Sequence, residues 1–303
     1  MRTIIDKRYL RLVNRNNPLE KHTPDDYNYE DVLVKMSNGE IIESDEVVEK
    51  GAKSSIVKTF IEEKTLDAFN ALKDDLAKKG FNTRINEAGR TEDKQAFYRK
   101  RAEEKSLEYA ENYVANPYET EHGHGTAVDV GIFSKLVSKV KNPNLNGKIH
   151  KVVRKLVLYP VMHKVATKYG FILRYPVKYN LTDERRKEIQ AHKDYKVDYV
   201  NLPMDDNGII DDSSIRDNTI KSSGKEFRKL LVQYNYEPWH LTYVGAYNAE
   251  FMTNNKLTME EYVRLVENYE QYADEFGDDE KCPSLQEFYN LMTIGKNFDD
   301  RNM

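Results

Sequence analysis

The sequence predicts an α+β domain with a mostly antiparallel central sheet flanked by helices. Strand-like segments are interspersed with helix-like ones, an early segment has the pattern of a hairpin, and no glycine-rich phosphate loop is present. The 303 residues are enough for one substantial core or two modest ones. We therefore expect one main domain at 31–270, a surface arm at 1–30 and a C-terminal helical extension at 271–303.

The N-terminal third supplies the first strands of this prediction. Residues 1–30 mix charges with prolines, which is typical of an irregular arm. Residues 31–37, followed by Asn38-Gly39 and then Ile41-Ile42, predict a hairpin because Asn-Gly favours the positive φ angles of a two-residue turn.

A helix, a strand and a second helix are expected next. Apolar residues repeat at helical spacing from Thr65 to Leu76, and Gly80 lies where helices commonly end. Residues 82–88 read as a strand. Thr91, followed by two acidic residues, predicts the start of a helix that runs to about Tyr113.

The second half of the chain alternates in the same way. Residues 148–169 predict a helix that is kinked or divided at Pro160, before a strand at 171–175. Residues 177–232 look like an insertion between two strands of the main sheet, either a lid over a binding site or a solvated decoration. Thr258 with Glu261, and Ser284 with Glu287, fit reciprocal caps of two further helices.

Composition excludes several classes of protein. The net charge of −4 argues against a nucleic-acid-binding surface, and no apolar run is long enough for a membrane span. Met1 is not followed by the apolar core of an export signal. Cys282 is the single cysteine, so any metal site must use His, Asp or Glu.

Two distant segments carry the candidate chemistry. The first, residues 120–130, contains His122 and Asp129 on either side of a glycine turn, and the second contains Glu237 and His240. Each pair alone is a weak pattern. Together they supply three ligands for one zinc ion (His122, Asp129 and His240), an open position for water, and a carboxylate, Glu237, to act as general base.

These motifs resemble those of the VanY-type D-alanyl-D-alanine carboxypeptidases, zinc peptidases that act on bacterial peptidoglycan. His122-x-x-Gly-x-Ala-x-Asp129 and Glu237-Pro-Trp-His240 match the metal and base motifs. Residues 88–91 with Gln95, residues 169–176 and residues 12–18 also agree with the family. The resemblance covers roughly residues 10–176 and 233–270.

The resemblance implies a zinc site in a cleft over the sheet. It gives Arg90 a catalytic and substrate-binding role, because a guanidinium can hold a peptide carboxylate or a developing oxyanion. The other predicted substrate-binding residues are Thr120, Gln95, Trp239 and His124, with Gln95 bracing the site. Three positions depart from the family pattern: Thr120 replaces a serine but keeps a hydroxyl, His124 replaces a small polar residue, and Thr242 replaces an arginine.

His124 is interpreted as solvated or substrate-facing, ahead of a role as metal ligand. The remaining histidines, His22, His150, His163 and His192, are interpreted as solvated.

The resemblance implies a zinc carboxypeptidase, D,D- or L,D-specific, that removes a terminal D-alanine from a peptidoglycan stem peptide. Two alternatives remain: an endopeptidase on the same scaffold, and a zinc-retaining binding module that has lost turnover. The intact Glu237 argues against the binding module. We expect a monomer that binds muropeptides and acts at the cell envelope or outside a bacterial cell, with a cytoplasmic location still possible.

Overall fold

The computed structural model describes residues 1–15, 17–20, 23–134, 143–177, 232–277 and 279–293. The chain divides into two compact units. The sheet unit comprises Val13–Arg174 and Glu237–Thr253, and the terminal unit comprises Met1–Leu12, Tyr175–Tyr236 and Asn254–Met303. Segments from both ends of the chain therefore belong to the terminal unit.

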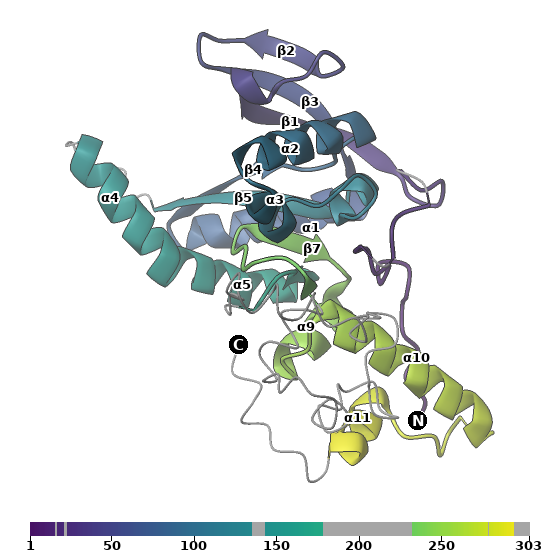
Figure 1. Cartoon of the computed structure of the whole chain (residues 1–303). Helices are drawn as coiled ribbons and strands as arrows, with labels where there is room; N and C mark the ends of the chain where they lie inside the picture. The colour runs from purple at the N-terminus through teal and green to yellow at the C-terminus, as the bar shows by residue number, and fades with distance from the viewer. Residues whose placement is uncertain (16, 21–22, 135–142, 178–231, 278, 294–303) are drawn as a thin grey trace, which may run out of the picture. The chain divides into compact units, whose positions relative to one another are not determined.

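The sheet unit confirms the predicted α+β class with antiparallel sheets. Its larger sheet has the order β4-β5-β7-β6, and each neighbouring pair is antiparallel (Figure 1). The four strands are β4 (Phe81–Glu87), β5 (Ala127–Ser134), β6 (Phe171–Leu173) and β7 (His240–Tyr243).

One face of this sheet is covered by the hydrophobic core. On β5, Val128, Val130 and Ile132 alternate along the strand and are fully buried. They share a core with residues of two helices, α1 (Glu63–Lys78) and α5 (Tyr159–Lys168). Because side chains alternate along a strand, Asp129 points to the opposite face of the sheet.

The smaller sheet shows that the predicted hairpin is wrong. Strand β1 (Tyr29–Ser37) pairs along its whole length with β3 (Ser54–Glu62), and β2 (Glu46–Lys50) lies on the other side of β3. Asn38-Gly39 lies in a 3-10 turn, η1 (Asn38–Glu40), which is closed by reciprocal bonds between Ser37 and Glu40. This capping box overrides the intrinsic turn preference of Asn-Gly.

The helical predictions of this half are mostly confirmed. Helix α1 contains the expected buried stripe, and Gly80 follows it with a φ of 85°. The predicted helix from residue 92 to 113 is in fact two helices, α2 (Glu92–Lys105) and α3 (Leu107–Tyr113). Ser106 separates them because its backbone is extended and its hydroxyl accepts a hydrogen bond from the Tyr109 amide, which caps α3.

The interruption near Pro160 is also confirmed. Helix α4 (Pro143–Val153) continues into a π-helical segment, η4 (Arg154–Leu158), and then into α5, where Pro160 lies in the first turn. Proline lacks an amide proton and clashes with the preceding turn, which accounts for the wider helix just before it.

In the terminal unit, α10 (Met259–Phe276) and α11 (Leu285–Thr293) begin at the two predicted caps. A further helix, α9 (Ala246–Asn254), was not predicted and lies almost wholly in the sheet unit. No helix among the described residues is long and apolar enough to cross a membrane. Residues 178–231 of the expected insertion, and with them His192, lie outside the described residues, as does His22.

Candidate metal centre

His122 lies in a tight turn that the sequence dictates locally. The 3-10 turn η2 (Glu121–His124) is capped by the Thr120 hydroxyl, which accepts a hydrogen bond from the His122 amide at 3.4 Å. Gly125 ends the turn with a φ of 70°, and a Cβ there would lie 2.9 Å from the Glu62 amide nitrogen. Only glycine suits this position, so the His-x-x-Gly spacing has a structural reason.

The orientation of the His122 ring is fixed from behind. Its Nδ1 lies 2.5 Å from the Ala88 carbonyl oxygen, so Nδ1 carries the proton and donates it, which leaves the Nε2 lone pair exposed to the site. Burial, reinforced by the nearby Arg90 charge, lowers the pKa of His122 to about 4. The ring is therefore neutral at neutral pH, as a metal ligand must be.

Asp129 faces His122 from strand β5. Its Oδ1 lies 3.6 Å from His122 Nε2, and its Oδ2 accepts a hydrogen bond from Arg90 Nη2 at 2.9 Å. Burial by itself raises the pKa of the Asp129 carboxyl, but the groups around it, among them the Arg90 guanidinium that donates to Oδ2, hold it well below its usual value. The carboxylate is therefore ionised and directed at the imidazoles.

His240 is brought to this point by strand pairing. It is the first residue of β7 and pairs in register with Asp129 of β5. Its Nδ1 lies 3.4 Å from Asp129 Oδ1, and its ring meets that of His122 edge-on with centroids 4.9 Å apart. The antiparallel ladder thus converts a separation of more than a hundred residues into direct proximity.

These three side chains fit a metal ion. Their ligand atoms all lie within 4.8 Å of one another. His122 Nε2 and Asp129 Oδ1 are buried, and neither has a hydrogen-bond partner within the described part of the chain. Buried polar atoms are costly to leave unsatisfied, and a cation held between these two would satisfy both. Two imidazoles and one carboxylate are a typical ligand set for zinc with an open position.

Glu237 lies beside this group on the segment that leads into β7. Its Oε2 is 3.8 Å from His240 Nδ1, and its backbone carbonyl accepts a hydrogen bond from the His240 amide at 3.0 Å. The residue is 9% exposed, so its carboxylate faces the site rather than bulk solvent. This position suits a base that serves a water at the metal without binding the metal itself.

Arg90 connects the metal ligands to strand β4 and helix α2. Besides its bond to Asp129, its Nη1 donates to Gln95 Oε1 at 3.2 Å, and its Nε lies 3.5 Å from Glu87 Oε2. Gln95 in turn donates to the Ala115 carbonyl at 2.7 Å. These contacts fix the Arg90 guanidinium in position beside Asp129.

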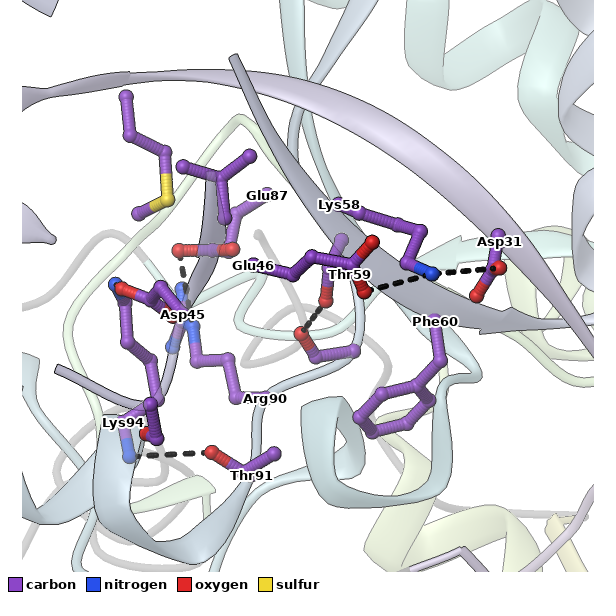
Figure 2. A pocket seen from close by; sticks show the side chains of 14 residues that line it. Asp31, Asp45, Glu46, Lys58, Thr59, Phe60, Glu87, Arg90, Thr91 and Lys94 are labelled. Atoms are coloured by element: carbon purple, nitrogen blue, oxygen red, sulfur yellow. Dashed lines mark hydrogen bonds and ion pairs between the residues drawn. The ribbon is translucent and has the colours of Figure 1, made fainter. Parts of the chain in front are cut away.

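A cavity of about 220 Å³ adjoins Arg90 on the side of the smaller sheet. Figure 2 shows its two walls. Arg90 and Thr91 directly precede α2 and Lys94 lies in its first turn, whereas Asp31, Lys58 and Phe60 come from β1 and β3. Lys58 pairs with Glu46 at 2.7 Å and with Asp31 at 3.4 Å, and the buried Lys94 pairs with Asp45. Half of the residues that line the cavity are therefore charged, and they form ion pairs with one another.

Comparison with known proteins agrees with the motifs. The family model for VanY, D-alanyl-D-alanine carboxypeptidase, matches residues 58–193. The resemblance to the VanY family is confirmed. The match includes His122 and Asp129, whereas Glu237 and His240 lie beyond it.

Two curated proteins are similar to the chain. The putative carboxypeptidase YodJ of Bacillus subtilis (strain 168) is 25% identical over 222 residues, which are 72% of this chain but 59% of YodJ. The bifunctional D-Ala-D-Ala dipeptidase and D-Ala-D-Ala carboxypeptidase VanXYC of Enterococcus gallinarum is 24% identical over 266 residues, 87% of this chain and 98% of that protein.

Two solved structures of peptidases are also similar to the chain. A variant of the D,D-pentapeptidase VanY in complex with Zn(II) is 22% identical, with a TM-score of 0.46 over 84% of this chain and 98% of that chain. The LD-carboxypeptidase LdcB is 21% identical, with a TM-score of 0.47 over 86% of this chain and 94% of that chain.

The other residues predicted to bind substrate differ in their burial and contacts. Thr120 is buried and its hydroxyl caps the His122 turn. Trp239 is 36% exposed, and its backbone carbonyl accepts a bond from the Val130 amide at 2.9 Å. His124 is not solvated: it is 4% exposed and packs edge-on against Tyr27, with centroids 5.9 Å apart. It does not belong to the metal-binding group found among the described residues.

Three residues gain a role that the sequence did not reveal. The side chains of Glu121 and Arg174 are fully buried and form an ion pair at 2.5 Å. This pair links the turn of His122 to β7, because the Arg174 amide donates to the His240 carbonyl at 3.4 Å. The solvated interpretation of His163 is wrong: its Nε2 donates to the Pro238 carbonyl at 2.8 Å and supports the Glu237 segment.

The remaining described histidine also departs from the prediction. His150 is half-buried and meets the Phe133 ring edge-on at 6.2 Å.

Proposed function

We propose that the protein is a zinc-dependent carboxypeptidase that removes a C-terminal D-alanine from peptidoglycan stem peptides. The observation that carries the proposal is the convergence of His122, Asp129 and His240 within 4.8 Å, with the Glu237 carboxylate beside them. VanXYC, which is similar over most of its length, is a D-Ala-D-Ala dipeptidase and carboxypeptidase, and this similarity supports the same substrate class.

The three ligands would hold one zinc ion per chain. When bound, zinc lowers the pKa of a coordinated water to about 7 and polarises a carbonyl oxygen. His122 Nε2 is presented to that ion by the Ala88 carbonyl behind the ring, and Asp129 is held against it by Arg90. We place this centre in a cleft over the β4-β5-β7-β6 sheet, on the face from which Asp129 projects.

Glu237 would take the proton of the attacking water and return it to the leaving amine. Its position beside His240, with Oε2 3.8 Å from Nδ1, favours this role. His163 and Pro238 keep the short segment that carries Glu237 in place.

Arg90 would bind the terminal carboxylate of the peptide, or the oxyanion that forms during attack. A guanidinium fixed by Glu87, Gln95 and Asp129 loses little entropy when a further carboxylate binds to it. Thr120, Trp239 and His124 complete the proposed substrate contacts, with Gln95 as a positioning residue.

Peptides that end in D-Ala-D-Ala and tetrapeptides that end in a single D-Ala are both compatible with this site. We propose that the protein works as a monomer at the cell envelope or outside the cell, with a cytoplasmic location as the alternative.

The decisive experiment is incubation of the zinc-loaded protein with defined tri-, tetra- and pentapeptide muropeptides, followed by mass analysis. Release of free D-alanine is expected. Cleavage into two peptides would instead identify an endopeptidase, and zinc binding without any cleavage would identify a binding module.

The matched control is Glu237→Gln, which removes the base but keeps the shape of the side chain. It should leave zinc stoichiometry unchanged and reduce turnover by roughly 100- to 10,000-fold. Unchanged turnover in this variant would contradict the proposed mechanism.

A further inference from the structure

One long segment of the chain has no acidic residue at all. From Val130 to Thr182 the sequence contains eleven Lys or Arg residues and no Asp or Glu, although the whole chain has 51 acidic residues and a net charge of −4. The segment follows Asp129 directly and includes helix α4, the π-helical segment η4 and helix α5. Positive charge is therefore concentrated in one stretch of an otherwise acidic protein.

Part of this charge lies in a helical stretch that also exposes apolar groups. Lys148, Lys151 and Val152 of α4, together with Lys155 and Leu156 of the π-helical segment that continues it, make up an exposed stretch here called the basic apolar face. All five are exposed, Val152 at 56% and Leu156 at 68%. Figure 1 shows α4 extending past the end of β5, away from the sheet.

Other side chains of the same helical stretch pack against the sheet unit. Leu158 is fully buried in the core of the sheet unit, and Val153 packs against that core. Arg154 lies over the Phe133 ring at 5.2 Å. The helix is thus held in place by its inner side, and burial in the core does not account for the exposed Val152 and Leu156.

Helix α1 of the same unit provides the contrast. Its lysines alternate with acidic residues, and two pairs are close: Lys64 with Asp67 at 4.0 Å, and Lys79 with Asp75 at 3.2 Å. Lysines of this kind belong to an ordinary solvated surface. The basic apolar face has no acid in its own helix that could neutralise it.

We propose that the basic apolar face binds an anionic lipid surface. Helices that lie in a membrane interface combine lysines, which attract anionic headgroups, with apolar side chains that insert between the headgroups. A soluble polyanion would attract the lysines but would leave Val152 and Leu156 in water. The presence of both kinds of side chain on one face therefore favours the lipid surface.

The proposal is independent of the peptidase activity and is tested on the full chain by co-sedimentation with vesicles. Vesicles that mix phosphatidylcholine with phosphatidylglycerol should bind the protein, and vesicles of phosphatidylcholine alone should not. Binding should weaken as salt is raised, because salt screens the lysines. Equal binding to both kinds of vesicle, or to neither, would overturn the proposal.

Two variants separate the charged from the apolar contribution. The triple variant K148Q/K151Q/K155Q should bind mixed vesicles roughly 100-fold more weakly, since each lysine contributes about fivefold near an anionic surface. The double variant V152S/L156S should lose about tenfold while keeping its salt dependence. The control K64Q/K73Q/K78Q makes the same charge change on α1 and should alter binding by less than about threefold.

Two further results of these binding experiments would contradict the lipid proposal. If the control weakens binding as much as the triple variant does, net charge and not this face is responsible. If polyglycerol phosphate in solution binds tightly and V152S/L156S binds vesicles like the wild type, the face is a polyanion site and the lipid proposal is wrong. All variants alter exposed side chains, and an unchanged near-UV circular dichroism spectrum verifies their fold.

Discussion

The two sheets of the sheet unit differ in how they are buried, and the difference explains where the candidate metal centre lies. In the larger sheet, β5 and β7 are buried on both faces for nearly their whole length. In the smaller sheet, β2 is exposed at every residue, and β1 alternates between exposed and buried positions. Asp129 and His240 belong to the first sheet, whereas the second contributes one wall of the cavity beside Arg90.

A strand packed on both faces has little freedom to shift, so it can hold ligand atoms at fixed separations. A half-exposed sheet tolerates substitution and adjusts to what binds against it. We therefore expect changes in the larger sheet to affect metal binding and stability, and changes in the smaller sheet to affect at most the contents of the cavity. Four substitutions test this contrast, in order of decreasing effect.

The largest effect is expected for Asp129→Ala. It removes one of three proposed ligands and leaves Arg90 beside two imidazoles without the carboxylate between them. Zinc affinity should fall by more than the roughly 10- to 100-fold that loss of an outer-shell partner costs. Metal analysis after dialysis measures this directly, and full zinc occupancy in the variant would refute the ligand assignment.

Arg174→Met should come next. It leaves the buried Glu121 carboxylate without its cation, which costs about 3–5 kcal/mol of unfolding free energy. Zinc affinity should also fall by about 10- to 100-fold, because the pair links the His122 turn to β7.

Denaturant unfolding and metal titration measure the two effects of Arg174→Met. Arg264→Met is the matched control, since its pair with Glu267 is half exposed, and it should cost less than about 1 kcal/mol. A stable Arg174→Met protein with unchanged zinc affinity would show that the buried pair does not position the ligands.

Gln95→Ala should have an intermediate effect. It leaves the Ala115 carbonyl and one proton of Arg90 without their partner, at a cost of about 1–3 kcal/mol. Zinc should remain bound, while KM for a muropeptide should rise because Arg90 is less well fixed. A loss of zinc in this variant would mean that Gln95 supports the metal ligands and not the substrate contact.

Lys58→Gln should have the smallest effect. Lys58 belongs to β3 of the smaller sheet, and its partners Glu46 and Asp31 are largely exposed. The stability change should be below about 1 kcal/mol, and zinc affinity should be unchanged. Thermal unfolding with and without zinc provides the measurement, and a change in zinc affinity would show that the two sheets are coupled.

Elements fixed by local chemistry were predictable from sequence. The caps at Thr258 and Ser284 and the glycine stop at Gly80 depend on groups within a few residues of one another, and the structure has each of them. The errors arose where two local preferences competed. At Asn38-Gly39 the capping box of Ser37 and Glu40 prevailed over the turn preference, and at Ser106 a cap divided an apparently continuous helix.

Strand pairing and the burial of side chains were harder to predict from the sequence. Nothing near Asp31 in sequence indicates that β1 pairs with β3, because the partner strand lies beyond an intervening turn and strand. His124 lies between two glycines and His163 next to a lysine, yet one is buried against Tyr27 and the other supports Pro238. Such contacts depend on the fold of the whole unit and leave no local pattern.

The sequence by itself determined the chemistry of the candidate centre: two imidazoles, two carboxylates, and a glycine whose positive φ shapes the His122 turn. Only the tertiary structure decided that these groups meet. The register of β5 against β7 sets Asp129 opposite His240, and the Ala88 carbonyl selects the nitrogen that His122 presents. The physical reason is that donor identity is a property of single residues, whereas distances between ligand atoms are set by strand pairing and buried contacts across the chain.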